Sequence, residues 1–147
     1  MKRAGAYKRE KRLYLNPKSK TTMGLWLDTS PLIILDETEP PPIKGKQVRE
    51  LLRRSREGVP QPTDWDNLMR AFLQEVGVKS WSRFAKTAVT CTIEFDGDQF
   101  VFRPYRRGGP KDHYAFFPIE DRKMTISSDA SDEELGLMLE KAFNACE

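Results

Sequence analysis

The chain has 147 residues, of which 38% are hydrophobic and 32% are charged, and its formal net charge is +3. This composition is typical of a soluble globular domain, and no apolar run approaches the roughly 18–20 residues that a membrane span requires. We therefore expect one soluble domain without a membrane partner.

Basic residues are concentrated at the N-terminus. Residues 1–20 hold eight basic side chains and one acidic side chain, a net +7, which leaves −4 for the remainder. Such a segment can bind nucleic acid, although an ordinary solvated terminus has the same composition. Because residues 1–11 have little apolar surface to bury, we predict a flexible basic arm at 1–11 and a single α+β domain at 12–147.

The compartment is inferred from what the sequence lacks. The N-terminus is charged, and no apolar stretch of a secretory signal is visible. Cys91 and Cys146 lie in apolar patterns that favour two free, buried thiols in a reducing compartment. We therefore expect a cytoplasmic protein.

The first part of the domain is predicted to contain short strands. Apolar runs at 13–15, 24–28 and 32–35 favour strands, and Asn16-Pro17 favours a turn after the first of them. Residues 36–42 are acidic and rich in proline, so we expect an extended, exposed loop there.

Helical periodicity appears three times. Apolar residues recur at helical spacing in 47–57, 65–76 and 132–146, and Ser131 with Glu134 can form a capping box. Trp65 falls on the apolar stripe of the second helix, which indicates a core position. The stretch 78–86 has no clear period, and a short helix capped by Ser80 is our preferred interpretation.

The stretch 89–103 predicts a β-hairpin. Apolar and polar residues alternate from Val89 to Phe95, Asp96-Gly97 suits a tight turn, and Phe100 and Phe102 continue on the return strand. A further strand is expected at 123–127. The sequence thus predicts an α+β fold, a mostly antiparallel sheet of about five or six strands with three helices packed against it.

Motifs of catalysis are missing from the sequence. His113 is the only histidine, the two cysteines are not at metal-ligand spacing, and there is no P-loop, dinucleotide fingerprint or nucleophile elbow. We therefore expect no enzyme activity and no catalytic residue. We also expect no metal, no cofactor and no small-molecule substrate.

One loop suggests nucleic-acid binding. Arg106, Arg107 and Lys111 surround two glycines, and arginines and glycines of this kind can contact phosphates. An ordinary charged hairpin loop without a binding function can have the same composition. Together with the basic arm, these residues define an alternative function, a small RNA- or DNA-binding module.

Three stretches, in this order and spacing, resemble a known family. They are Ser-Lys-Thr-Thr-Met-Gly-Leu-Trp at 19–26, Ser-Arg-Glu-Gly-Val-Pro-Gln-Pro at 55–62 and Val-Lys-Ser-Trp-Ser-Arg-Phe-Ala-Lys at 78–86, and the helix start at 129–136 fits too. In them the sequence resembles the immunity proteins of bacterial contact-dependent growth inhibition (CDI) systems. The likeness covers residue 12 to the end and leaves the basic arm outside.

The resemblance implies a role but no site residues. It implies a cytoplasmic protein that binds and neutralises the C-terminal toxin domain of a CdiA-type exported effector, often a nuclease, by stoichiometric protein–protein binding. An acidic inhibitor would complement the basic groove of a nuclease. We therefore nominate four acids, Asp28, Asp36, Glu37 and Glu39, and one interface tryptophan, Trp26, as toxin-binding residues.

Overall fold

A large, mainly antiparallel sheet is the central layer of the molecule. The computed structural model describes residues 1–147. The strands are β1 (Lys2–Arg9), β2 (Arg12–Thr21), β3 (Trp26–Asp28), β4 (Ile33–Asp36), β5 (Glu57–Val59), β6 (Val89–Phe95), β7 (Gln99–Arg107), β8 (Phe116–Pro118) and β9 (Met124–Ser127). The helices are α1 (Pro41–Arg53), α2 (Trp65–Val76), α3 (Trp81–Thr87) and α4 (Asp132–Asn144), with 3-10 turns η1 (Pro110–Asp112) and η2 (Glu120–Arg122).

The sheet topology agrees with the predicted class. The strand order is β3-β2-β1-β6-β7-β8, β4 and β5 also pair with β2, and β9 pairs with β7. Only the short β2–β5 pair is parallel. The α+β class and the mostly antiparallel sheet are therefore confirmed, but there are nine strands rather than five or six and four helices rather than three.

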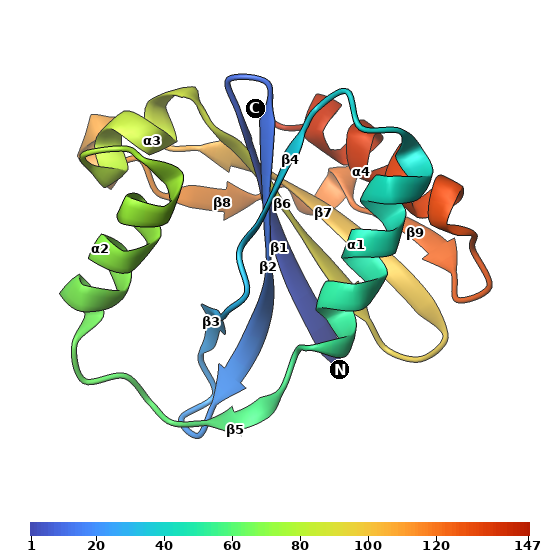
Figure 1. Cartoon of the computed structure of the whole chain (residues 1–147), viewed down its shortest axis with the longest axis horizontal. Helices are drawn as coiled ribbons and strands as arrows, with labels where there is room; N and C mark the ends of the chain where they lie inside the picture. The colour runs from blue at the N-terminus through green and yellow to red at the C-terminus, as the bar shows by residue number, and fades with distance from the viewer.

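The two faces of the sheet are covered by different helices. In Figure 1, α1 and α4 lie on one side of the sheet, and α2 and α3 lie on the other. The main core lies under α1 and α4, where Ile93 and Phe102 of the sheet pack with Leu135 and Leu139 of α4. The predicted hairpin supplies much of this core, since β6 and β7 pair as expected and Gly97 takes a positive φ of 100° in the turn.

The flexible arm predicted at residues 1–11 is wrong, because residues 2–9 form β1 between β2 and β6. Ala4 and Ala6 point into the core and are 1% and 0% exposed. Alanines bury little area, so hydrophobicity alone does not mark this strand. Hydrogen bonding to a strand on each side holds it, and Arg3 pairs with Glu94 of β6 at 2.8 Å.

The turn predicted at Asn16-Pro17 is also wrong, since β2 runs through both residues. Arg12–Leu15 pairs with β4, whereas Lys18–Lys20 pairs with β3. Pro17 therefore lies at the gap between β4 and β3, which pair with successive parts of β2, and a residue without an N–H is tolerated there.

The first helix is displaced from its predicted bounds of 47–57. It begins at Pro41, because Pro41 and Pro42 have no N–H to leave unpaired and their fixed φ suits a first turn. It ends at Arg53, and Glu57–Val59 forms β5 instead. The expected exposed loop at 36–42 is correspondingly shorter.

The other helix boundaries follow their capping residues. Ser131 and Glu134 form the predicted capping box, and Ser80 caps α3, which confirms the preferred short helix at 80–86. Asp64 accepts the Asn67 N–H at the start of α2, and Gly77 ends it with a φ of 74°.

Candidate functional site

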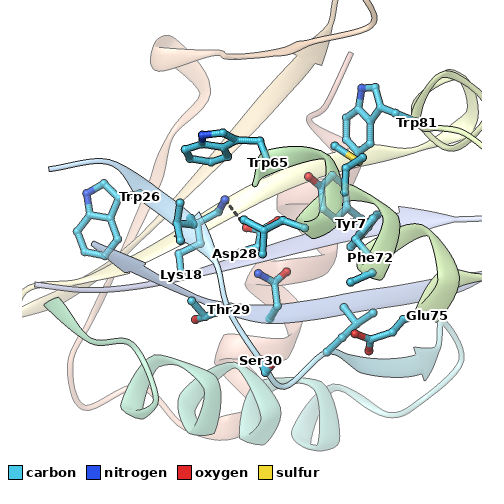
Figure 2. Close-up of a pocket in the computed structure, with 16 residues that line it drawn as sticks. Tyr7, Lys18, Trp26, Asp28, Thr29, Ser30, Trp65, Phe72, Glu75 and Trp81 are labelled. Atoms are coloured by element: carbon cyan, nitrogen blue, oxygen red, sulfur yellow. Dashed lines mark hydrogen bonds and ion pairs between the residues drawn. The ribbon is translucent and has the colours of Figure 1, made fainter. Parts of the chain in front are cut away.

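An open groove lies between helix α2 and the strands β2 and β3 of the sheet. Its volume is about 350 Å³. All three tryptophans of the chain, Trp26, Trp65 and Trp81, line it, and Figure 2 shows them around the groove. Trp26 comes from β3, and Trp65 and Trp81 come from the successive helices α2 and α3, so the tertiary fold brings the strand and the two helices together.

Helix α2 leaves its apolar side partly open to solvent. No residue of α2 is buried. Trp65, Leu68 and Met69 are 47%, 42% and 40% exposed, and all three line the groove. The prediction of a core position for Trp65 is therefore wrong. Large exposed apolar side chains gathered in one concave patch mark an interaction surface.

The inner end of the groove is closed by an aromatic cluster. Tyr7 of β1 lies at ring-centroid distances of 5.8 Å from Phe72 and 6.2 Å from Trp81. Phe84, which is fully buried, lies 5.2 Å from Phe72 in an edge-to-face arrangement. Such pairs fix ring positions, so this wall of the groove is rigid.

An ion pair lies in the middle of the groove. Lys18 Nζ donates to Asp28 Oδ1 at 2.7 Å, shown dashed in Figure 2. The path of the Lys18 side chain depends on Gly5, because a Cβ there would come within 2.8 Å of Lys18 Cε. Partial burial acts to raise the pKa of Asp28, but Lys18 and the Asn16 amide outweigh it, so the pKa of this carboxyl lies below its ordinary value.

Asn16 contributes a buried polar group to the groove. It is 3% exposed, and its Nδ2 donates to the Pro17 carbonyl at 2.9 Å. Its Oδ1 is buried and has no hydrogen-bond partner within the protein. An unsatisfied buried acceptor is uncommon in proteins, so this atom requires an explanation.

The structure divides the five nominated toxin-binding residues into two groups. Trp26 and Asp28 both line the groove, as alternate residues of β3 on one face. The guanidinium of Arg3 lies 4.6 Å from the Trp26 ring centroid. Whether these residues contact a toxin stays a prediction.

Asp36, Glu37 and Glu39 do not line the groove. Asp36 accepts hydrogen bonds from the Thr38 N–H at 2.9 Å and from its hydroxyl at 2.7 Å, and these bonds hold the pKa of Asp36 below its ordinary value. Glu37 faces Lys8 at 3.4 Å, and its carbonyl accepts from Lys44 Nζ. The first two acids thus have local structural partners.

The residues of the nucleic-acid alternative are mostly engaged within the protein. Arg107 donates to the Ala88 carbonyl at 2.6 Å, and the Arg106 guanidinium lies 4.6 Å from the Phe117 ring centroid. Lys111 is exposed in η1. The basic arm is a sheet strand whose Lys2 donates to the Ser55 carbonyl. No geometric feature favours this alternative, and it stays a prediction.

Sequence reasoning missed Asn16, Lys18, Leu68 and Met69 as groove residues. The apolar residues of α2 recur at the helical spacing of a buried face, so the pattern predicts that they belong to the core. The available signal was the count of three tryptophans, of which only Trp65 was assigned to the core.

The two cysteines of the chain do not line the groove. Cys91 is buried and Cys146 is half-buried, both are free, and burial raises the pKa of each thiol. No cluster of three or more histidine, cysteine or acidic side chains could hold a metal ion. No helix has the length and apolar character to cross a bilayer.

A protein-family model and two solved structures match the chain. The model of the CDI immunity protein family matches residues 2–146. A search of curated proteins gives no match.

Two solved structures share the fold. A protein of unknown function from Neisseria meningitidis, NMB0488, is 19% identical with a TM-score of 0.82, and the match covers 99% of this chain and 95% of that one. A CdiA-CT/CdiI toxin and immunity complex from Yersinia pseudotuberculosis matches at 14% identity with a TM-score of 0.80, covering 99% and 97%.

Proposed function

Because this chain belongs to the CDI immunity protein family, we propose that it binds the C-terminal toxin domain of a CdiA-type effector and neutralises it by forming a stoichiometric complex. The solved complex of similar fold pairs an immunity protein with such a toxin domain. The proposed action is binding rather than catalysis, and the site identified above is a groove that can receive a protein segment.

The observation that carries the binding surface is the open groove of the three tryptophans. Trp65, Leu68 and Met69 are about half exposed although they form the apolar stripe of a helix. Tryptophan is enriched at the centres of protein interfaces, where burial on binding contributes most of the energy. We assign toxin contact to this groove, including Trp26 and Asp28.

Two finer parts of the function rest on the family likeness and on charge. We propose a nuclease as the toxin and the cytoplasm as the place of action, where nucleic-acid substrates are found. A nuclease cleft is basic, and the groove carries two carboxylates, Asp28 and Glu75, against one ammonium, Lys18. Asp36, Glu37 and Glu39 remain a second candidate contact surface.

The test is co-production of this chain with the toxin domain encoded beside its gene. We expect a 1:1 complex that survives moderate salt on affinity purification, and restored growth of cells that make the toxin. Absence of both the complex and the rescue would contradict the proposal. Recovery of nucleic acid, lost as salt rises, would favour the nucleic-acid alternative instead.

Matched variants locate the surface. Trp65→Ala should weaken the complex at least tenfold, as expected for an interface tryptophan. Leu137→Ala is the control, because Leu137 is 43% exposed on α4, outside the groove. The combined variant Asp36→Asn, Glu37→Gln and Glu39→Gln tests the second surface, and equal losses from both sites would contradict the groove as the main contact.

A further inference from the structure

The charged and buried polar groups of the groove offer mainly hydrogen-bond acceptors. Asn16 Oδ1 is buried without a partner, and the Asn16 amide hydrogens are directed to other groups. The carboxylates of Asp28 and Glu75 also accept only, whereas the one cation, Lys18, already donates to Asp28. A carboxylate has room for further donors beyond the single bond from Lys18. A partner that satisfies Asn16 Oδ1 and these carboxylates therefore supplies N–H or O–H donors.

The remaining surface favours a positively charged group on an apolar stem. Aromatic faces attract cations, tryptophan most strongly, and Trp65 is 47% exposed in the groove, whereas Arg3 already lies over Trp26 with its guanidinium 4.6 Å from the ring centroid. Leu68, Met69 and Phe72 offer an apolar wall against which an aliphatic stem can pack. The lining carries two carboxylates and one ammonium, so its formal charge also favours a cation.

We propose that the groove receives the side chain of one lysine or arginine of the toxin domain, with Asn16 Oδ1 and the Asp28 carboxylate accepting its N–H groups. This inference rests on the proposed function and names the chemistry of the toxin residue. The arriving donor satisfies the acceptor of Asn16, which has no partner in the free protein. Asn16 is thereby a residue that determines which toxins bind.

The decisive experiment is a set of double-mutant cycles between Asp28→Asn and the toxin. Each lysine and arginine of the toxin domain is replaced in turn by methionine, which keeps an apolar stem and removes the charge. One position should lose affinity and couple to Asp28→Asn by at least about tenfold in Kd, the lower range for close charge pairs. The same position should couple to Asn16→Leu.

Asp98→Asn is the matched control. Asp98 is an exposed carboxylate in the β6–β7 turn, outside the groove. If no basic toxin residue couples to Asp28→Asn by more than about twofold, or if the coupling to Asp98→Asn is as large, the proposal is overturned. Asp28→Asn keeps the shape of the side chain, so it remains informative where Asn16→Leu does not fold.

A toxin-independent measurement separates this inference from the proposed function. All three indole N–H signals of the chain come from groove residues, so they report on the groove. Titration with arginine amide should shift them more than titration with citrulline amide, its uncharged analogue, and Asp28→Asn should reduce the difference. Equal shifts, or none, would overturn the inference even if the toxin binds; binding of arginine amide without toxin binding would contradict the proposed function alone.

Discussion

At the scale of single residues, the groove depends on an ion pair between two neighbouring strands. Lys18 of β2 reaches Asp28 of β3 at 2.7 Å, and the missing side chain of Gly5 leaves room for the lysine stem. Because the pair is only partly desolvated, with Asp28 36% exposed, its contribution to stability is modest. Its role in the groove is to keep the Asp28 carboxylate charged and in place.

The depressed pKa of Asp28 predicts how the stability of the protein depends on pH. A carboxyl whose pKa is lower in the folded state contributes stability that is present above its unfolded pKa, about 3.9, and is lost as pH falls through the folded pKa. We expect the difference in unfolding free energy between the wild type and Asp28→Asn to be constant above about pH 5 and to shrink below about pH 4. Urea unfolding of both proteins across this range measures it. A difference that grows on acidification would contradict the assignment.

Part of the site could be predicted at this scale, for a physical reason. Trp26 and Asp28 alternate on one strand, so strand geometry alone puts both side chains on the same face. Asn16 and Lys18 share the same relation on β2, but the prediction of a turn at Asn16-Pro17 concealed it. The position of α2 opposite these strands depends on tertiary contacts that no local pattern encodes.

At the scale of elements, α1 and α4 approach so closely that two glycines are required. A Cβ on Gly45 would lie 1.7 Å from the Asp132 carbonyl oxygen, and one on Gly136 would lie 1.9 Å from the Pro41 carbonyl oxygen. Both neighbours are backbone atoms, which cannot rotate away as a side chain could. The two helices must therefore separate if either glycine acquires a side chain.

We expect Gly45→Ala and Gly136→Ala each to destabilise the protein. Alanine is favoured over glycine inside a helix by about 1 kcal/mol, but overpacking of a fitted contact costs about 1–3 kcal/mol or more. Since the clash involves backbone on both sides, the net loss should be at least about 1 kcal/mol. Denaturant unfolding measures it. Gly109→Ala is the control, because nothing lies within 4 Å of its Cβ position and its φ of −87° suits alanine; equal losses at all three sites would contradict the packing argument.

Helix α2 should contribute to binding more than to stability. Leu68 is 42% exposed, whereas Leu139 of α4 is fully buried. Leu139→Ala should cost about 2–5 kcal/mol of unfolding free energy, and Leu68→Ala about 1 kcal/mol or less. Toxin affinity should fall more for Leu68→Ala than for Leu139→Ala. Urea midpoints and binding constants of the two variants decide it, and a large stability loss from Leu68→Ala would show that α2 is core after all.

Periodicity predicts that an element has a covered face, but it does not identify what covers that face. The stripes of α2 and α4 look alike in sequence. Yet α4 buries Leu135, Leu139 and Phe143 against the sheet while α2 buries none of its residues. Helix α4 packs against α1 and the strands β6 and β7, whereas the stripe of α2 borders the open groove. This is why the fold class was predictable and the groove was not.

At the scale of the whole molecule, the sheet separates two tasks. The face under α1 and α4 holds the main hydrophobic core, and the opposite face carries the aromatic cluster and the groove. The main core and the proposed toxin-binding groove thus lie on opposite sides of one sheet. We therefore expect substitutions in the groove to alter toxin binding without removing contacts of the main core.

The N-terminal strand belongs to both faces, which gives the last prediction. Ala4 and Ala6 of β1 pack in the core, whereas Tyr7 lies in the aromatic wall of the groove. We expect deletion of residues 2–9 to abolish folding, because it leaves β2 and β6 without the strand between them and exposes their hydrogen-bonding groups.

A charge-neutralised chain separates the strand from its basic character. Lys8→Gln, Lys11→Gln and Arg12→Gln together remove three positive charges and keep the backbone intact. This variant should fold and bind toxin, as judged by circular dichroism and affinity purification, whereas the deletion should do neither. If the deletion variant folds, residues 2–9 are dispensable, as the prediction of a flexible arm implied. If the neutralised chain folds but does not bind the toxin, the basic charge itself contributes to binding, because the strand and both faces of the sheet are still present.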